Sequence, residues 1–142
     1  MRETANRLLS ALSGYAGCPD FELDDLDTGG MVIQGIPFTF FYSDESEELF
    51  SCASIGEPPK GLERTQCLRE LLRGNFSWAG TGGGILGIDK IDGQVCLSRR
   101  YSLESETEPS FLENVAIQVG LAKHWQGVIA PKSSIPVNMI RS

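Results

Sequence analysis

The residue pattern most suggestive of chemistry is the glycine-rich segment from Trp78 to Asp89, WAGTGGGILGID. Within it, Gly82 to Gly87 satisfy G-x-G-x-x-G, the pattern that places a dinucleotide pyrophosphate at the N-terminus of a helix. Such a site needs a strand before the glycines and a helix after them. Here a helical pattern comes first and a hairpin pattern follows. We therefore expect the glycines to form a turn, and a small nucleotide-binding enzyme using Gly82–Gly87 is only a remote alternative.

The cysteines and the single histidine are the next candidates for catalysis. A cysteine nucleophile needs a neighbouring base, and His124 lies late in a helical pattern, where packing or helix-end roles are usual. The cysteines are scattered and contain no C-x-x-C pair, which argues against structural zinc and predicts reduced core residues: Cys18, Cys52, Cys67 and Cys96. The sequence therefore predicts no catalytic residue, no metal site and no cofactor.

The charged residues also predict structure more readily than chemistry. Asp89 and Asp92 lie in a short hairpin turn and offer too few oxygen ligands for calcium, so they are expected to be turn residues. The acidic runs within 22–27 and 44–48 are typical of solvated loops. Arg99 and Arg100 could hold a carboxylate, although two arginines make no basic patch.

Composition narrows the class of protein further. The chain has 142 residues and a formal net charge of −7, with a pI near 4.7 and a mean hydropathy of −0.10. An acidic surface disfavours nucleic acid and anionic membranes, and suits either solubility or a basic or amphipathic polypeptide partner. No apolar run is long enough to cross a bilayer, and the N-terminus lacks a secretory signal pattern, so we expect a cytoplasmic protein.

The elements that would position these residues follow from periodicity. Apolar residues recur with helical spacing from Ala5 to Ala16, over 62–75, and from about 107–110 to 126. Alternating or β-rich runs over 31–35, 36–44, 48–56, 85–89 and 94–103 predict strands. The fold class is α+β, in the order α-β-β-β-α-β-β-α, with three helices and a twisted, mostly antiparallel five-stranded sheet. Residues 1–126 are expected to form one domain, and 127–142 a loosely ordered extension.

A small acidic domain that is poor in catalytic groups and rich in apolar faces suits a binding protein. An extended or partly unfolded peptide can lie on apolar patches or add a strand to a sheet edge.

The segment LRELLRGNFSWAGTGGGILGIDKIDGQVCLSRRYSL, residues 68–103, resembles the core of the class I type III secretion chaperones, the CesT/Tir-chaperone-like family. The pattern is a helix ending in L-L-x-x-N, a glycine-rich turn, a strand of the type L-G-I-D, and a G-x-V turn into the next strand. The closing helix, FLENVAIQVGLAKHWQ, is also similar to the last helix of that family, and the resemblance covers about residues 3–126. The matching positions are Leu71, Leu72, Asn75, Phe76, Gly84, Leu86, Gly87, Ile88, Asp89, Gly93 and Val95.

This resemblance implies a non-enzymatic homodimer in the cytoplasm of a Gram-negative bacterium. Such chaperones bind the extended N-terminal segment of a secreted effector, keep it secretion-competent without ATP, and help deliver it, with the secretion ATPase as a further candidate partner. Neither nucleic acid binding nor membrane insertion is implied. A regulatory adaptor of the same fold, which sequesters a secretion regulator, is the alternative.

The resemblance also implies which residues meet a partner. The second helix and the fourth strand of such chaperones build the dimer interface, which here corresponds to Leu68, Leu71, Leu72, Trp78, Ile85, Leu86 and Ile88. The first helix and the sheet supply the effector-binding patches, which correspond to Leu8, Leu9, Leu12, Phe38, Phe40 and Tyr42. For every one of these residues, plain core packing is the competing interpretation, because core and binding face share one apolar pattern.

Overall fold

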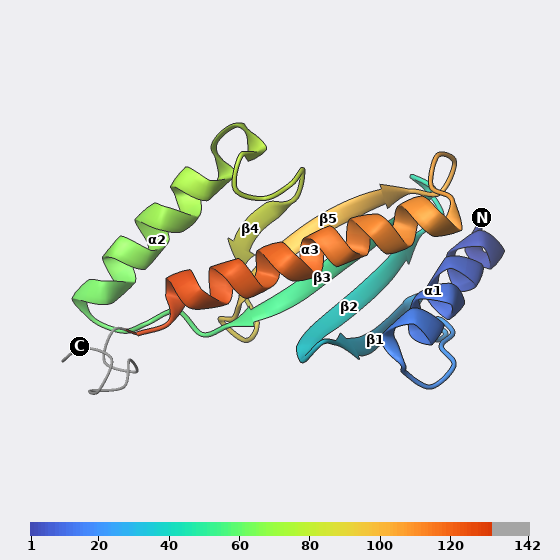
Figure 1. Cartoon of the computed structure of the whole chain (residues 1–142), viewed down its shortest axis with the longest axis horizontal. Helices are drawn as coiled ribbons and strands as arrows, with labels where there is room; N and C mark the ends of the chain where they lie inside the picture. The colour runs from blue at the N-terminus through green and yellow to red at the C-terminus, as the bar shows by residue number, and fades with distance from the viewer. Residues whose placement is uncertain (132–142) are drawn as a thin grey trace.

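The computed structural model describes residues 1–131 of the chain, and its elements follow the predicted order (Figure 1). The α+β fold class is confirmed. One short 3₁₀ helix, η1, follows the second helix and was not predicted. The elements are α1 (Arg2–Ala16), β1 (Thr28–Ile33), β2 (Ile36–Ser43), β3 (Glu48–Gly56), α2 (Leu62–Asn75), η1 (Phe76–Trp78), β4 (Ile85–Ile88), β5 (Val95–Ser102) and α3 (Glu108–Ile129).

All five strands join one antiparallel sheet in the order β1-β2-β3-β5-β4. β1 and β2 form a two-residue hairpin, in which Gln34 and Gly35 both have positive φ, as the right-handed twist of a hairpin requires. β3 pairs with β5, not with β4, because α2 and the glycine-rich turn carry the chain to the far side of β5. The two edges of the sheet are therefore β1 and β4.

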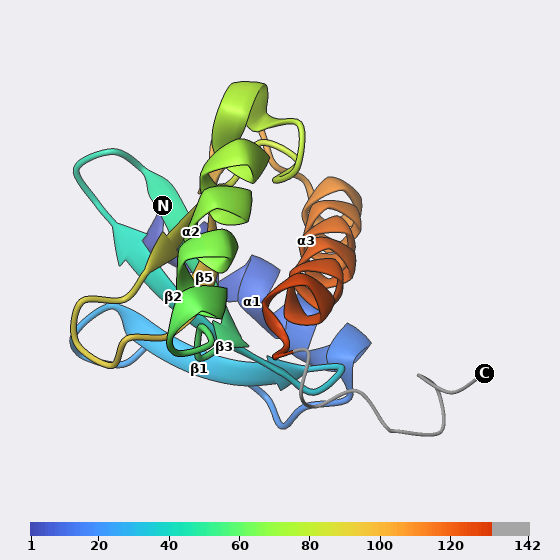
Figure 2. The ribbon, with the colours of Figure 1, turned by 90° about the vertical axis from the view of Figure 1, so that its left-hand side faces the viewer.

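Two helices cover one face of the sheet and leave the other face open (Figures 1 and 2). α3 runs along β3 and β5, and α1 lies beside it on the same face. The alternation of β2 turns Phe38, Phe40 and Tyr42 toward these helices, where all three side chains are buried. The uncovered face of the sheet is called the outer face below.

A buried amide ties α3 to the sheet. The Gln118 side chain accepts hydrogen bonds from the hydroxyls of Ser51 and Tyr101, at 3.0 and 2.7 Å, and donates one to the Leu97 carbonyl at 3.0 Å. Burial raises the pKa of the Tyr101 phenol well above its usual value. The polar groups of this network are satisfied, so it orients α3 without an orphaned donor or acceptor.

One boundary of the last helix differs from expectation. A capping box of Thr107 and Ser110 begins α3 within the predicted range of 107–110. The predicted domain boundary at 126 falls inside α3, which continues to Ile129 because that side chain is buried in the core. The rest of the predicted extension, residues 132–142, lies outside the described residues.

Candidate functional site

The glycine-rich segment serves as a turn between α2 and β4. Gly82 and Gly83 have φ of 59° and 92°, the left-handed region that glycine adopts freely. A Cβ on Gly84 would lie 2.5 Å from the Ser98 carbonyl oxygen, so this glycine permits close approach of β4 to β5. An added Cβ on Gly87 would meet no atom within 4 Å in the described chain. A strand follows the glycines, so they present no helix N-terminus to a phosphate.

Asn75 joins the end of α2 to the edge strand β4. Its amide nitrogen donates to the Leu86 carbonyl at 2.9 Å, and its amide oxygen accepts the Leu86 N–H at 2.8 Å. These two groups of Leu86 belong to the free edge of β4, so Asn75 occupies the position that an added strand would take. On the other side of the loop, the Trp125 indole donates to the Gly80 carbonyl at 2.8 Å. α2, η1 and β4 therefore form one fixed unit.

That unit exposes a set of large apolar side chains, called the α2–η1–β4 surface: Leu72, Phe76, Trp78, Ile85 and Ile88. Leu72, Phe76 and Trp78 are 73, 77 and 64% exposed. Ser77 and Trp78 both have positive φ, which is uncommon for residues other than glycine. The fold thus holds a strained turn that presents two aromatic rings to solvent.

Four of the seven residues predicted to build a dimer interface lie on this surface, namely Leu72, Trp78, Ile85 and Ile88. Leu68 is half-buried against the core, and Leu71 and Leu86 are buried within it. Helical and strand alternation explains the split, because Leu71 and Leu86 occupy the faces that turn inward. Phe76 matched the family pattern but was not predicted to lie at the interface. Its exposure follows from the η1 turn, which was not predicted either.

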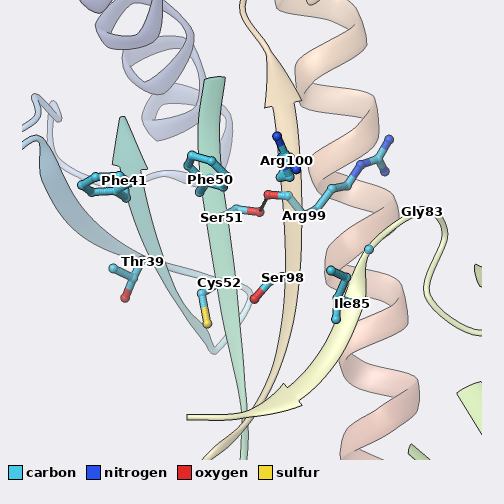
Figure 3. A pocket seen from close by; sticks show the side chains of 11 residues that line it. Thr39, Phe41, Phe50, Ser51, Cys52, Gly83, Ile85, Ser98, Arg99 and Arg100 are labelled. Carbon is cyan, nitrogen blue, oxygen red and sulfur yellow. Dashed lines mark hydrogen bonds between the residues drawn. The ribbon is translucent and has the colours of Figure 1, made fainter. Parts of the chain in front are cut away.

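The outer face of the sheet carries a groove of about 400 Å³ (Figure 3). Phe41 of β2 and Phe50 of β3 are cross-strand partners whose ring centroids lie 6.0 Å apart. Ile85 of β4 stands across β5 from them. The groove is lined by Thr39, Phe41, Phe50, Ser51, Cys52, Gly83, Gly84, Ile85, Ser98, Arg99 and Arg100.

Arg100 is held in place at the rim of this groove. Its guanidinium donates two hydrogen bonds to the Glu48 carboxylate, at 2.6 and 3.0 Å, and lies 5.4 Å from the centroid of the Phe50 ring. The hydrogen bonds from Arg100 lower the pKa of Glu48. The arginine pair was expected to be able to hold a carboxylate, and Arg100 holds that of Glu48.

None of the six residues predicted to bind an effector is exposed. Each is at most 2% exposed and packs between the helices and the inner face of the sheet: Leu8, Leu9, Leu12, Phe38, Phe40 and Tyr42. A bound segment contacts accessible side chains, so in the folded chain these six have a core role instead. The apolar pattern of these six residues therefore marks the core, in which they pack between the helices and the sheet.

The remaining candidate groups make no catalytic constellation among residues 1–131. The Asp89 carboxylate accepts a hydrogen bond from the Ile91 N–H at 2.8 Å, and that of Asp92 accepts one from the Gln94 N–H at 2.9 Å, as turn residues do. His124 is exposed on α3, with its ring against Trp125. Within the part that the structure describes, no three His, Cys, Asp or Glu side chains gather as a metal site would need, and no helix is long and apolar enough to cross a membrane.

Comparison with known proteins gives the family directly. The model of the Tir chaperone protein (CesT) family matches residues 7–126. No curated protein sequence matches the chain.

Several solved structures share the fold. A chain of the ExsC–ExsE complex superposes with a TM-score of 0.78 at 22% identity, over 93% of this chain and 98% of that one. A chain of the HopA1–SchA chaperone–effector complex superposes with a TM-score of 0.68 at 20% identity, over 89% of this chain and 95% of that one. A chain from the structure of the Yersinia pestis type III secretion chaperone SycH with a fragment of YscM2 superposes with a TM-score of 0.63 at 18% identity, over 84% of this chain and 98% of that one.

Proposed function

The chain belongs to the Tir chaperone protein (CesT) family, and on that premise we propose that this type III secretion chaperone binds the extended N-terminal segment of a secreted effector. Binding keeps the segment soluble and secretion-competent, and helps deliver it to the secretion apparatus without ATP. The proposed activity is association alone.

The observation that carries this proposal is the groove on the outer face. An extended segment presents side chains to alternate sides, so it can place an apolar side chain between Phe41, Phe50 and Ile85. The Arg100–Glu48 pair holds one rim in a single arrangement before any partner arrives, which lowers the ordering cost of binding. We place the effector segment here, and not on the six buried residues.

We propose further that two copies of the chain associate through the α2–η1–β4 surface. Its exposed leucine, isoleucine, phenylalanine and tryptophan side chains are of the types that gather in interface cores. An apolar patch of this kind is costly to leave in water, which favours a partner of matching shape. Because Asn75 occupies the β4 edge, we expect contact through side chains and not through a continuous sheet at Leu86.

The test uses the full chain, co-expressed with N-terminal segments of candidate secreted proteins encoded beside it. We expect one segment to co-purify and to resist protease only when bound. Phe41→Thr keeps strand propensity but removes the ring from the groove, and should weaken binding by about tenfold or more, given about 1.5–3 kcal/mol for a buried aromatic side chain.

The matched control is Val32→Thr, an exposed position of β1 that does not line the groove. It should leave binding unchanged. If every segment binds equally well to the Phe41→Thr variant, the groove is not the binding site. If none of the segments is protected by the wild-type chain, the chaperone role itself is contradicted. A bound segment from a secretion regulator would instead support the adaptor alternative.

A further inference from the structure

Two cysteines from different strands lie together on the outer face. Cys52 of β3 is paired with Ser98, and Cys96 of β5 is paired with Ser54, so the two cysteines are diagonal neighbours across one strand pair. Both line a shallow hollow of about 240 Å³ beside Gly87. Cys52 also lines the main groove (Figure 3). An added Cβ on Gly87 would meet nothing within 4 Å, so the space above the hollow is open.

The two thiols have different environments. Despite partial burial, contacts with Cys96 and Ser98 lower the pKa of Cys52 to about 7. The same contact with Cys52, together with burial, raises the pKa of Cys96. The Cys96 thiol donates a hydrogen bond to the Gln94 carbonyl, with 3.7 Å between sulfur and oxygen. Cys52 is therefore the more acidic thiol of the pair.

We propose that Cys52 and Cys96 form a peroxide-reactive dithiol, with Cys52 as the nucleophile and Cys96 as the resolving thiol. The Cys52 thiolate attacks one oxygen of hydrogen peroxide, the O–O bond breaks, and Cys52 becomes a sulfenic acid while hydroxide leaves. The Cys96 sulfur then attacks the Cys52 sulfur, so that the S–S bond forms while the S–O bond of the sulfenic acid breaks. The hydroxyl group takes up the proton of the Cys96 thiol and leaves as water. The two thiols are oxidised by two electrons, and peroxide is the oxidant.

The position on the sheet predicts a reversible bond. Diagonal residues of an antiparallel pair have Cα atoms about 7–8 Å apart, whereas disulfides usually span about 4.4–6.8 Å. A disulfide here must draw β3 and β5 together locally, and strained disulfides are the readily reduced ones. This inference concerns thiol chemistry alone, and it holds or fails independently of what the groove binds.

The other cysteines supply internal controls. Cys67 lies on the buried side of α2, and burial raises its pKa, so it should react slowly. Cys18 lies at the β1 edge, where its thiol donates to the Val32 carbonyl at 3.2 Å. Neither cysteine lines the hollow with the Cys52–Cys96 pair.

The experiment treats the full-length reduced chain with hydrogen peroxide at pH 7 and maps the products by peptide mass spectrometry. We expect a Cys52–Cys96 disulfide, lower in mass by two hydrogens and restored by dithiothreitol. Because the pKa of Cys52 is lowered and that of Cys67 is raised, we expect Cys52 to react about fivefold or more faster than Cys67, after allowance for the lower nucleophilicity of a more acidic thiol. Cys96→Ser should accumulate a sulfenic acid at Cys52 that dimedone traps, and Cys52→Ser should abolish the disulfide.

The double variant Cys18→Ser, Cys67→Ser is the matched control and should still form the disulfide. Circular dichroism of each variant checks that it is folded. Two results would overturn the proposal: alkylation of Cys52 no faster than that of Cys67 in the folded wild-type chain, or peroxide products that link two chains and leave the Cys52–Cys96 pair reduced.

Discussion

Asp24 shows what one side chain does in the acidic stretch that precedes the sheet. Its carboxylate accepts hydrogen bonds from the N–H groups of Leu26 and Thr28 and from the Thr28 hydroxyl, at 2.9–3.1 Å. The stretch was predicted as a solvated loop, and it is one, but this carboxylate also sets where β1 begins. The hydrogen bonds from Thr28 are the main cause of the lowered pKa of Asp24.

The lowered pKa makes a prediction about acid stability. A carboxyl group whose pKa is lower in the folded chain stabilises the fold above its unfolded pKa, here about 3.8, and loses that contribution as pH falls through the folded value. Asp24→Asn should therefore lower the urea midpoint at pH 6, and its curve should converge with the wild type as pH falls below about 3.8. Asp25→Asn is the control, since Asp25 is exposed and the hydrogen bonds to Leu26 and Thr28 are made by Asp24. A deficit that persists unchanged at low pH would contradict this account.

At the level of elements, the joint between α2 and β4 decides how both apolar surfaces are presented. The L-L-x-x-N pattern ends in an asparagine because its amide matches one N–H and one C=O of an edge strand at once. The glycine-rich turn then brings β4 against β5 at Gly84. The glycine-rich residues that resemble a nucleotide-binding motif in the sequence thus form the turn that connects α2 to β4.

Asn75→Ala should leave the N–H and C=O groups of Leu86 without their protein partner. Because Leu86 is buried, we expect a loss of about 1–3 kcal/mol in the free energy of unfolding, measured by urea titration. Asn114→Ala removes an amide whose one observed hydrogen bond, to Glu106, is 3.3 Å long, and it should cost less. Equal losses in the free energy of unfolding for the two variants would contradict the stabilising role given to the two hydrogen bonds between Asn75 and Leu86.

Replacement by alanine should lower the stability of the chain at one glycine of the same segment and be tolerated at another. Gly84→Ala places a methyl group 2.5 Å from the Ser98 backbone oxygen, so it should lower stability by about 1–3 kcal/mol. Gly87→Ala meets no atom within 4 Å and should be tolerated in the folded chain. Thermal unfolding of both variants in parallel checks the contrast. If Gly87→Ala were the more damaging, the assignment of close approach to Gly84 would be wrong.

The elements themselves could be predicted because periodicity and turn residues are local signals. The alternation along 36–44 puts Phe38, Phe40 and Tyr42 on one face of a strand and Phe41 on the other, which is the arrangement in the structure. Which face is covered depends on where α1 and α3 pack, and no local pattern contains that information. Leu12 and Leu72 are both apolar positions of helices, yet one is buried and the other exposed. The Cys52–Cys96 neighbourhood likewise depends on the β3–β5 register.

At the level of the whole molecule, the fold has one covered face and several uncovered apolar areas. The inner face, α1 and α3 make the core, while the groove and the α2–η1–β4 surface remain in solvent. The net charge of −7 keeps such a chain soluble while these areas are free. The two areas meet at Ile85. Apart from that residue, a copy of the chain and a polypeptide partner would contact different side chains.

The proposed dimer can be tested through one side chain. Trp78→Asn removes the exposed ring, and asparagine tolerates the positive φ at this position, so the monomer fold should survive. We expect the dimer dissociation constant to rise by roughly 30-fold or more, equivalent to about 2 kcal/mol for an aromatic anchor, in sedimentation equilibrium. Leu26→Asn, another exposed apolar position in a turn, should leave it unchanged. Equal dissociation constants for the two variants would place the interface elsewhere.

The most direct test of the central claim is the molar mass of the chain bound to a protected N-terminal segment, measured by light scattering during size-exclusion chromatography. We predict two copies of the 15.5 kDa chain together with one segment. A chain that elutes as a monomer at micromolar concentration, with no segment bound, would contradict the account.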